Sequence, residues 1–522
     1  MSRHADEVGL PSAVGPVDFV RIRQRKRDMV EQLVADYRAN YDSSDTELII
    51  GNGHFTAPRS LEVHSIYGAV RSLHADRVII NAGTRATLPD IPGLTGAAPM
   101  THIEALEMDT VPDHLIVIGG GYVGMELAQM FRRVGAQVNI VQRGPRLVAG
   151  EDADVSAALH ALLQDEGVRI ILDAELTQVR GQSEAGVETL LRTAQGPRSV
   201  IGSHLLMAVG RTPNTADIGL GNTGVRLDSH GYIRVNEYLE TGVPNVWAAG
   251  DCIGSPLFTH VAYDDMRVIR ASFAGGRRST VDRLIPYCVF TDPPLGRVGV
   301  SESEARAAGQ NVRVASMGMH EVMRALTLNE TTGFMKIIVA ADSDDILGFT
   351  MLGPESGEVT AVVQMAMLAG MPYPAVRDAI IAHPTMAEGL NKLLASVPPR
   401  RLLVLTLAST SGLAARARGV RLALREARLW CGRGPRDSAA FATSVVCVSS
   451  NCPSSPRKYR NCQPDRCHHA NADGDHAENH PASIKGPRPR HRACRDRRSP
   501  QLGAASGIVR PARVRHAVSC GA

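Results

Sequence analysis

The sequence predicts an α/β fold of several domains, and three observations predict it. A buried strand, a glycine-rich turn, a helix and a second strand follow one another between His114 and Gln142. Residues 284–397 have a different texture, with strand-like segments followed by helices, which is typical of an α+β domain. The length of 522 residues is sufficient for about two to four domains.

The segment before the glycine-rich turn predicts one long helix and several short strands. Asp18–Tyr41 has a helical, heavily charged pattern, and Glu47–Ile50, Ser60–His64 and Arg77–Ile80 have the composition of short strands. The basic run RIRQRKRD within the helix could suggest nucleic acid, but a solvated helix face is the more usual meaning. Residues 1–16 are expected to be disordered.

Three glycines occupy the turn between the strand His114–Ile118 and the helix Tyr122–Val134. Gly119 permits a tight turn, Gly121 lets the backbone approach a pyrophosphate, and Gly124 lets helix and strand pack closely. The start of the helix offers free N–H groups and the positive end of its dipole to phosphates. The sequence therefore predicts a dinucleotide-binding site.

The residue that ends the second strand predicts which nicotinamide nucleotide binds, because an acidic side chain there accepts from the 2′-hydroxyl of NAD. That position holds Gln142, and Arg143 and Arg146 follow it. These residues favour NADPH, with NADH still possible. The alternative is that both arginines lie on a solvated loop.

Beyond this unit the pattern alternates between helices and strands. Asp154–Glu166 is helical in pattern, and three or four strands are expected between Arg169 and Val209. Ser301-x-x-Glu304 has the form of a capping box and predicts the start of a helix. The remaining expected elements are the strand within Pro286–Phe290, strands Phe334–Ala340 and Ile346–Leu352, and helices over Gly357–Gly370, Pro374–Ile381 and Pro384–Val397.

Charge and cysteine content divide the chain at Pro398. The formal charge of +4 combines a body of −12 with a tail, residues 398–522, of +16. Only Cys252 and Cys288 of the nine cysteines precede the tail, which fits a reducing cytoplasm without a disulfide framework. No signal sequence or transmembrane helix is expected, so the predicted location is cytoplasmic.

The tail is expected to be a disordered extension or the product of a shifted reading frame, because it is rich in Arg and Pro and its apolar periodicity fades. Nucleic-acid binding by the tail is the weaker interpretation. No metal site is predicted, because the spacing of its Cys and His residues matches no standard zinc finger. Two Cys-x-x-x-x-Cys pairs in the tail, Cys447/Cys452 and Cys462/Cys467, are interpreted as chance.

Three further segments resemble the flavin-dependent pyridine nucleotide–disulfide oxidoreductases. They are IINAGT at 79–84, VGRTPN at 209–214 and NVWAAGD at 245–251, and they surround the glycine-rich turn in the order that this family has. THVAYDDMR at 259–267 and the segment 286–299 are similar to its reactive-chlorine-resistance copper(II) reductase branch. The mercuric reductases are the next most similar branch.

The resemblance covers Asp18–Val397 and implies a domain organisation. A partial three-layer FAD-binding domain would comprise residues 17–111 and 233–283, and a Rossmann-type NAD(P) domain, residues 112–232, would be inserted into it. An α+β dimerisation domain would follow at residues 284–397, so a homodimer is expected. No membrane partner is expected, and nucleic acid is an unlikely partner.

The resemblance also implies residues that bind the cofactors. Asp251 would accept from the ribityl chain of FAD, and Gly83 with Thr84 would give the flavin access to the backbone. His260 would lie at the start of a helix that faces the flavin, where the helix dipole stabilises negative charge. Glu126 would lie beside the nicotinamide. Gly210, in the segment VGRTPN, would also belong to the cofactor-binding residues.

The resemblance implies a catalytic pair in His383-Pro-Thr-x-x-Glu388. His383 would take a proton from a thiol, and Glu388 would orient the imidazole and stabilise its charge. The chain departs from the family because no glycine fingerprint precedes Gly119 and no cysteine precedes Cys252. It is therefore expected to begin after the first FAD fingerprint and the redox cysteine pair of the family.

The expected activity is that of an FAD-dependent oxidoreductase. Hydride would pass from NADPH to FAD, and electrons would pass on to a metal ion or a disulfide substrate. The missing fingerprint and cysteine pair would impair this activity. The alternative is a non-catalytic nucleotide-binding fragment or dimerisation partner.

Overall fold

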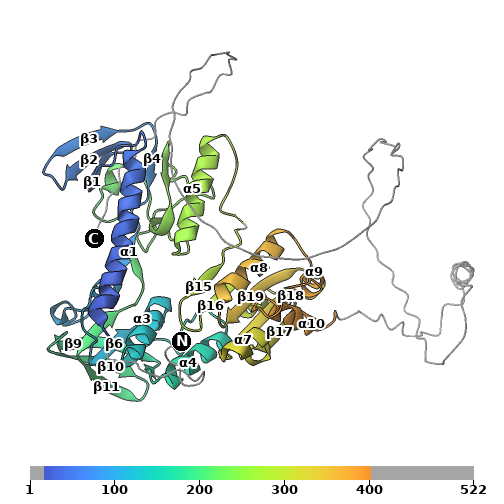
Figure 1. Ribbon diagram of the computed structural model, residues 1–522. Coiled ribbons are helices and arrows are strands. Elements are labelled where there is room, and N and C mark those ends of the chain that lie inside the picture. The colour runs from blue at the N-terminus through green and yellow to red at the C-terminus, as the bar shows by residue number, and fades with distance from the viewer. Residues whose placement is uncertain (1–16, 282, 401–522) are drawn as a thin grey trace, which may run out of the picture. The chain divides into compact units, whose positions relative to one another are not determined.

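The computed structural model describes residues 17–281 and 283–400, and Figure 1 shows its elements. The predictions about residues 1–16 and about the cysteines and histidines of the tail concern parts of the chain outside these described residues.

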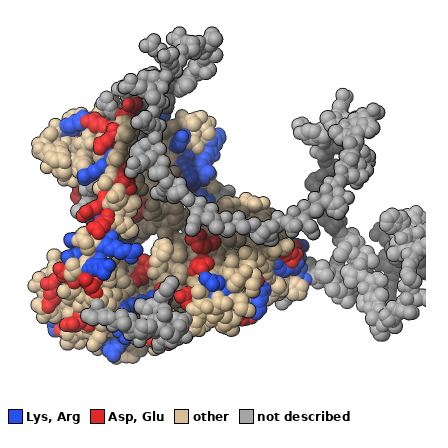
Figure 2. All heavy atoms as spheres, in the orientation of Figure 1, with Lys and Arg blue, Asp and Glu red and all other residues tan. Residues whose placement is uncertain are grey.

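Helix α1, Phe19–Asp42, confirms the predicted long helix (Figure 1). Its basic first half contacts a loop of the same chain, since Lys26 and Arg27 both pair with Glu107. These basic side chains therefore form ion pairs within the protein. Figure 2 shows both basic and acidic side chains along this helix. Phe19, its one buried residue, packs against the Phe131 ring at a centroid distance of 5.8 Å.

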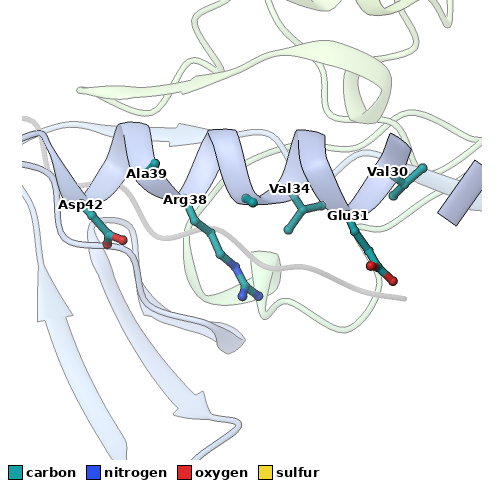
Figure 3. Close-up of a pocket in the computed structure, with 7 residues that line it drawn as sticks. Val30, Glu31, Val34, Arg38, Ala39 and Asp42 are labelled. Atoms are coloured by element: carbon teal, nitrogen blue, oxygen red, sulfur yellow. The ribbon is translucent and has the colours of Figure 1, made fainter. Parts of the chain in front are cut away.

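The second half of α1 exposes an apolar stripe. A shallow groove runs along this part of the helix. Figure 3 shows the side chains of Glu31, Val34, Arg38 and Asp42 pointing to the same side of the helix. No predicted site residue lines this groove, which therefore lies apart from the nucleotide chemistry. The lining residues are Val30, Glu31, Val34, Ala35, Arg38, Ala39 and Asp42.

A three-stranded antiparallel sheet follows, with the order β1–β2–β3. The strand expected at Glu47–Ile50 was wrong, because the chain pairs only from Ile50 onward and the strand is Gly51–Ala57. Pairing with the next strand, rather than local composition, places this strand. The bounds are β1 Gly51–Ala57, β2 Ser60–Ser65 and β3 Val70–His74.

The dinucleotide-type unit forms a four-stranded parallel sheet in the order β12–β6–β7–β8. The predicted first strand is confirmed without change as β6, His114–Ile118, whose last four residues are buried. Helix α3 follows the turn and packs against β6 and β7. The other bounds are α3 Tyr122–Arg133, β7 Gln137–Val141, α4 Ala153–Asp165, β8 Arg169–Ile171 and β12 His204–Met207.

Between β8 and β12 lies an antiparallel sheet in the order β11–β10–β9. The region Arg169–Val209 therefore holds five strands, not the three or four expected. Gly186 and Gly196 have φ of 109° and 110°, so the chain turns sharply where an alternating pattern had suggested fewer, longer strands. The bounds are β9 Ala174–Gln182, β10 Gly186–Thr193 and β11 Gly196–Gly202.

Two short strand pairs and two helices connect these sheets to the rest of the chain. β4 pairs in parallel with β14, and β5 pairs antiparallel with β13. The predicted helix after Phe258 is confirmed as α5. The bounds are β4 Val78–Ile80, β5 Thr84–Ala86, α2 His102–Ala105, β13 Arg211–Pro213, β14 Val246–Ala248 and α5 Thr259–Phe273.

The C-terminal part of the described chain is a five-stranded antiparallel sheet in the order β15–β16–β19–β18–β17. Helix α8 packs on β16 and β19, and α10 packs on β17 and β18 (Figure 1). The capping box at the start of α6 is confirmed. The bounds are β15 Tyr287–Val289, β16 Leu295–Gly299, α6 Glu302–Ala307, β17 Val312–Gly318, α7 Met323–Leu328, β18 Phe334–Ala340, β19 Ile346–Leu352 and α8 Ser356–Leu368.

The last two helices are shorter than the sequence suggested. Helix α9 spans Tyr373–Arg377 and α10 spans Gly389–Ala395, so the intervening residues form a loop. The Asn391 side chain donates to the carbonyls of Arg377 and Ala379, at 2.6 and 3.0 Å, which satisfies the end of α9. Pro384 disfavours helical geometry for the residue before it.

A buried ion cluster joins the α4 segment to the antiparallel sheet. Lys336 on β18 is 3% exposed and lies 3.0 Å from Asp152, 2.8 Å from Asp154 and 3.0 Å from Glu302. Burial disfavours its charged form, but hydrogen bonds to these carboxylates outweigh burial and raise its pKa to about 12. Asp152 also accepts from the N–H groups of Glu302 and Ser303.

We expect Lys336→Met to lower the free energy of unfolding by about 3 kcal/mol, because it leaves Asp152 buried without a counter-charge. Urea denaturation measures the change. The pKa of Lys336 is raised on folding, so its contribution should be complete below about pH 10 and be lost as the pH rises toward 12.

Lys392→Met is the matched control, because Lys392 forms an exposed ion pair with Glu321 at 3.0 Å. It should cost less than about 1 kcal/mol. Equal losses from the two variants would contradict a special role for the buried cluster.

Candidate functional site

The glycine-rich turn has the geometry that a bound pyrophosphate needs. Gly119 has φ of 110°, and an added Cβ there would overlap the carbonyl of Ala208. A Cβ on Gly124 would overlap the Gly119 carbonyl, so close packing of α3 on the turn requires glycine. Gly121, by contrast, faces open space. No side chain caps the start of α3, so its first N–H groups are available to a ligand.

Gln142 directly follows the second strand, which ends one residue earlier than predicted, at Val141, and its side chain already has a partner. Its Oε1 accepts from the Gly120 N–H at 2.9 Å, so the residue braces the glycine turn. Arg146 donates to the Ala149 carbonyl at 2.9 Å. The exposed Arg143 is the residue of this loop best placed to meet a 2′-phosphate.

A second cluster forms around Asp251, in the turn after β14. The Thr84 hydroxyl donates to the Asp251 carboxylate at 2.8 Å. Arg211 donates through Nε to Thr84 Oγ1 at 2.6 Å and lies 3.8 Å from Asp251. Gly83 has φ of 68° and open space where a Cβ would lie. These residues form a polar cluster, and at Gly83 the backbone beside it carries no side chain.

Sequence reasoning missed Arg211 as a site residue, although it nominated the neighbouring Gly210. Gly210 has φ of 122°, and its carbonyl accepts from the Thr87 N–H at 3.0 Å. It therefore shapes the crossing of β5 and β13. The available signal was an arginine directly after a glycine, within the family-like segment VGRTPN at 209–214.

His260 lies in the first turn of α5, as predicted, and no side chain caps the N-terminus of this helix. His260 is exposed, but its ring already has partners, because its Nε2 lies 2.7 Å from the Pro286 carbonyl and the ring stacks on Phe258. The backbone N–H groups of the first turn, rather than the imidazole, are what this helix offers to an anionic group.

Glu126 on α3 contacts the segment that follows β15. Its carboxylate accepts from the Phe290 N–H at 2.8 Å. Burial raises the pKa of Glu126, and the Phe290 N–H works against this increase. The contact fixes a half-buried carboxylate at the edge of the glycine-rich unit.

The thiol groups of both cysteines in the described chain have raised pKa values and so form thiolates poorly. Burial raises the pKa of Cys252, which is fully buried and donates to the Ala249 carbonyl at 3.3 Å. Burial also raises the pKa of Cys288. Neither thiol lies in the electropositive environment that activates a redox cysteine.

His383 and Glu388 lie together, as expected for the catalytic pair. The Nδ1 of His383 is 2.9 and 2.8 Å from the two carboxylate oxygens. This contact orients the imidazole and leaves Nε2 directed elsewhere. Within residues 17–281 and 283–400, no hydrogen bond joins the pair to the Asp251 cluster.

The described residues offer neither a metal-binding cluster nor a membrane-spanning helix. They contain no group of three or more His, Cys, Asp or Glu side chains that could hold a metal ion. Among the same residues no helix is both long enough and apolar enough to span a membrane.

Comparison with known proteins gives two family matches. Residues 5–265 match the pyridine nucleotide-disulphide oxidoreductase family, and residues 285–394 match the dimerisation domain of that family.

Individual relatives agree with these matches. The probable pyridine nucleotide-disulfide oxidoreductase RclA of Escherichia coli is 36% identical over 386 residues, covering 73% of this chain and 86% of RclA. A mercuric reductase of Lysinibacillus sphaericus is 30% identical over 394 residues, covering 75% and 71%. The solved Cu(II) complex of the HOCl-induced flavoprotein disulfide reductase RclA from Escherichia coli has a TM-score of 0.68 at 33% identity, covering 76% and 88%.

We expect Gly121→Ala to separate nucleotide binding from stability. The added methyl group meets open space in the protein but lies where a phosphate would approach, so NADPH affinity should fall by at least about tenfold with unchanged thermal unfolding. Gly124→Ala should instead destabilise the protein by about 1–3 kcal/mol through overlap with the Gly119 carbonyl. Fluorescence titration with NADPH and thermal denaturation measure both effects, and unchanged affinity in Gly121→Ala would contradict the assignment.

Proposed function

Since the chain belongs to the pyridine nucleotide-disulphide oxidoreductase family, we propose that it is an FAD-dependent oxidoreductase that uses NADPH to reduce a metal ion or a disulfide. Members of this family bind FAD and use NAD(P) as the pyridine nucleotide. The observation that carries the proposal is the convergence of Thr84 and Arg211 on Asp251, together with a complete glycine-rich turn in the same chain.

The residues around Asp251 fit the flavin half of FAD. The Asp251 carboxylate would accept from ribityl hydroxyls, and Gly83 would admit the ring system where a side chain would block it. The uncapped N-terminus of α5 would stabilise negative charge on the flavin. FAD, when bound, supplies a hydride acceptor. The role of this chain is to bind it, orient it and balance its charge.

We propose that Gly119, Gly121 and Gly124 hold the pyrophosphate of NADPH, with Arg143 at its 2′-phosphate. Gln142 contributes by bracing the turn at Gly120. Glu126, fixed by the Phe290 N–H, would border the nicotinamide. NADH is the second candidate nucleotide, because the exposed Arg143 guanidinium is the one discriminating contact.

The electron acceptor is proposed from the relatives and from the state of the thiols. One relative is called a mercuric reductase, and a solved RclA structure is a Cu(II) complex, so a metal ion is the favoured acceptor class. Cys252 and Cys288, whose pKa values burial raises, are unsuited to relay electrons. His383, oriented by Glu388, would then transfer protons at an acceptor or at a thiol of another molecule.

We propose that the protein acts as a homodimer in the cytoplasm. The family's dimerisation domain supports this assembly. Helix α8 exposes Val362, Met365 and Leu368, and Ile380 is fully exposed, so this domain offers an apolar surface to a second copy. The division into domains at residues 111, 232, 283 and 397 stays a prediction.

A non-catalytic nucleotide-binding protein is the second candidate. The raised thiol pKa values favour it. The predictions that the chain begins after the family's first fingerprint and that FAD binding is impaired stay predictions.

We expect the purified protein to bind FAD and to lose visible flavin absorbance when NADPH is added without oxygen. Cu(II) or Hg(II) should then restore the absorbance. Anaerobic absorbance titration measures both steps. A protein that binds NADPH but takes up no FAD would favour the non-catalytic alternative.

We expect Arg143→Ala to weaken NADPH binding by about tenfold, because a hydrogen bond to a charged phosphate is lost. NADH affinity should be unchanged. Arg198→Ala, which removes an exposed arginine from β11 of the same domain, is the control. Equal weakening of NADPH and NADH would contradict the role of Arg143 at the 2′-phosphate.

A further inference from the structure

Asp265 occupies a core position of helix α5. It is 0% exposed and lies on the same helical face as the buried Val261, Val268 and Ile269. The last two belong to an apolar cluster with Trp247. A carboxylate on such a face costs free energy unless both of its oxygens have partners. Its partners therefore indicate what the residue does.

Each carboxylate oxygen of Asp265 has one strong partner. Oδ2 accepts from the Gly250 N–H at 2.7 Å, and Oδ1 accepts from Arg283 Nη1 at 2.7 Å. Arg283 is 11% exposed, and its Nε also lies 3.2 Å from Asp264. The buried charge is thus compensated by a guanidinium, and its second oxygen is available to a backbone group.

That backbone group belongs to the turn that carries Asp251. Gly250 has φ of 70°, and an added Cβ would lie 2.6 Å from Asn81 Oδ1. A glycine in this conformation does not define the turn by itself, because its backbone is the least restricted of any residue. The bond from its N–H to Asp265 therefore fixes the direction in which the chain leaves β14 and presents Asp251.

We infer that Asp265 is a positioning residue for flavin binding, which holds Gly250 so that the Asp251 carboxylate faces the ribityl chain. The inference rests on the proposed function, because it takes Asp251 as the flavin-binding carboxylate. Arg283 donates to Asp265 and comes from the segment just before β15. The same pair therefore fastens the flavin-binding turn to the start of the antiparallel sheet.

The test uses Asp265→Asn in the full chain, with Asp264→Asn as its matched control. Asp264 is the neighbouring carboxylate, also pairs with Arg283, and makes no hydrogen bond to Gly250 in the described chain. FAD affinity of the flavin-free protein is measured by quenching of flavin fluorescence. NADPH affinity and the thermal unfolding of the flavin-free protein are measured alongside.

Asp265→Asn should weaken FAD binding by about tenfold, the effect of one charge-assisted hydrogen bond. NADPH affinity should change by less than about twofold. Asp264→Asn should change neither. A purely structural role would lower both affinities together, or would lower stability without changing FAD affinity, and either result would overturn the inference.

Two further outcomes are distinguishable. If the unmodified protein takes up no FAD, the proposed function fails and the inference fails with it. If it binds FAD and Asp265→Asn binds equally well, only the inference fails.

A second variant covers the case in which Asp265→Asn does not fold. Asp265→Asn with Arg283→Gln leaves no unpaired buried charge, so it should fold. It should still bind FAD about tenfold more weakly, because a neutral amide is a weaker acceptor for the Gly250 N–H. FAD affinity equal to that of the unmodified protein would overturn the inference.

Discussion

The crossing of β5 and β13 is the constraint on which the rest of the structure depends. The chain leaves the β4 region through β5, builds the glycine-rich unit, and returns through β13, so both connections to that unit lie side by side. The Thr84 hydroxyl joins the crossing to Asp251 through a hydrogen bond of 2.8 Å, and Arg211 in turn donates to Thr84 at 2.6 Å. One small cluster thereby links the Asp251 turn to both connections of the glycine-rich unit.

A second anchor is ionic and buried. The side chains of Glu151 and Asp152 contact the antiparallel sheet. Arg297 lies 3.2 Å from Glu151, and Lys336 lies 3.0 Å from Asp152. Buried pairs of this kind contribute little net stability, because desolvation offsets their attraction. What they supply is specificity, since a different docking of these segments would leave charges buried without partners. Tyr122, at the start of α3, also donates to Glu151 at 2.8 Å, so the anchor reaches the glycine-rich turn.

The sequence was sufficient wherever a pattern is local. Strands β6, β18 and β19 have their predicted bounds because each is an apolar run ended by glycine or by a polar turn. The turn glycines could be predicted for the same reason. Asp265 could not, since it belongs to a charged stretch that looks like a helix surface, and its partner Gly250 is 15 positions away. Arg211, 127 positions from its partner Thr84, shares this difficulty, as does the end of α9, which Asn391 determines from a later helix.

The bond between Gln142 and Gly120 links two properties that protein engineers usually treat as separate. The residue at the strand end is the usual target for exchanging one coenzyme for the other. In this protein its amide oxygen also accepts from the Gly120 N–H and so closes the glycine-rich loop. A carboxylate introduced at that position would direct negative charge both at the ribose and at the loop itself. A substitution of Gln142 would therefore change coenzyme preference and loop rigidity together. A substitution of the neighbouring Arg143 would change coenzyme preference independently of the loop.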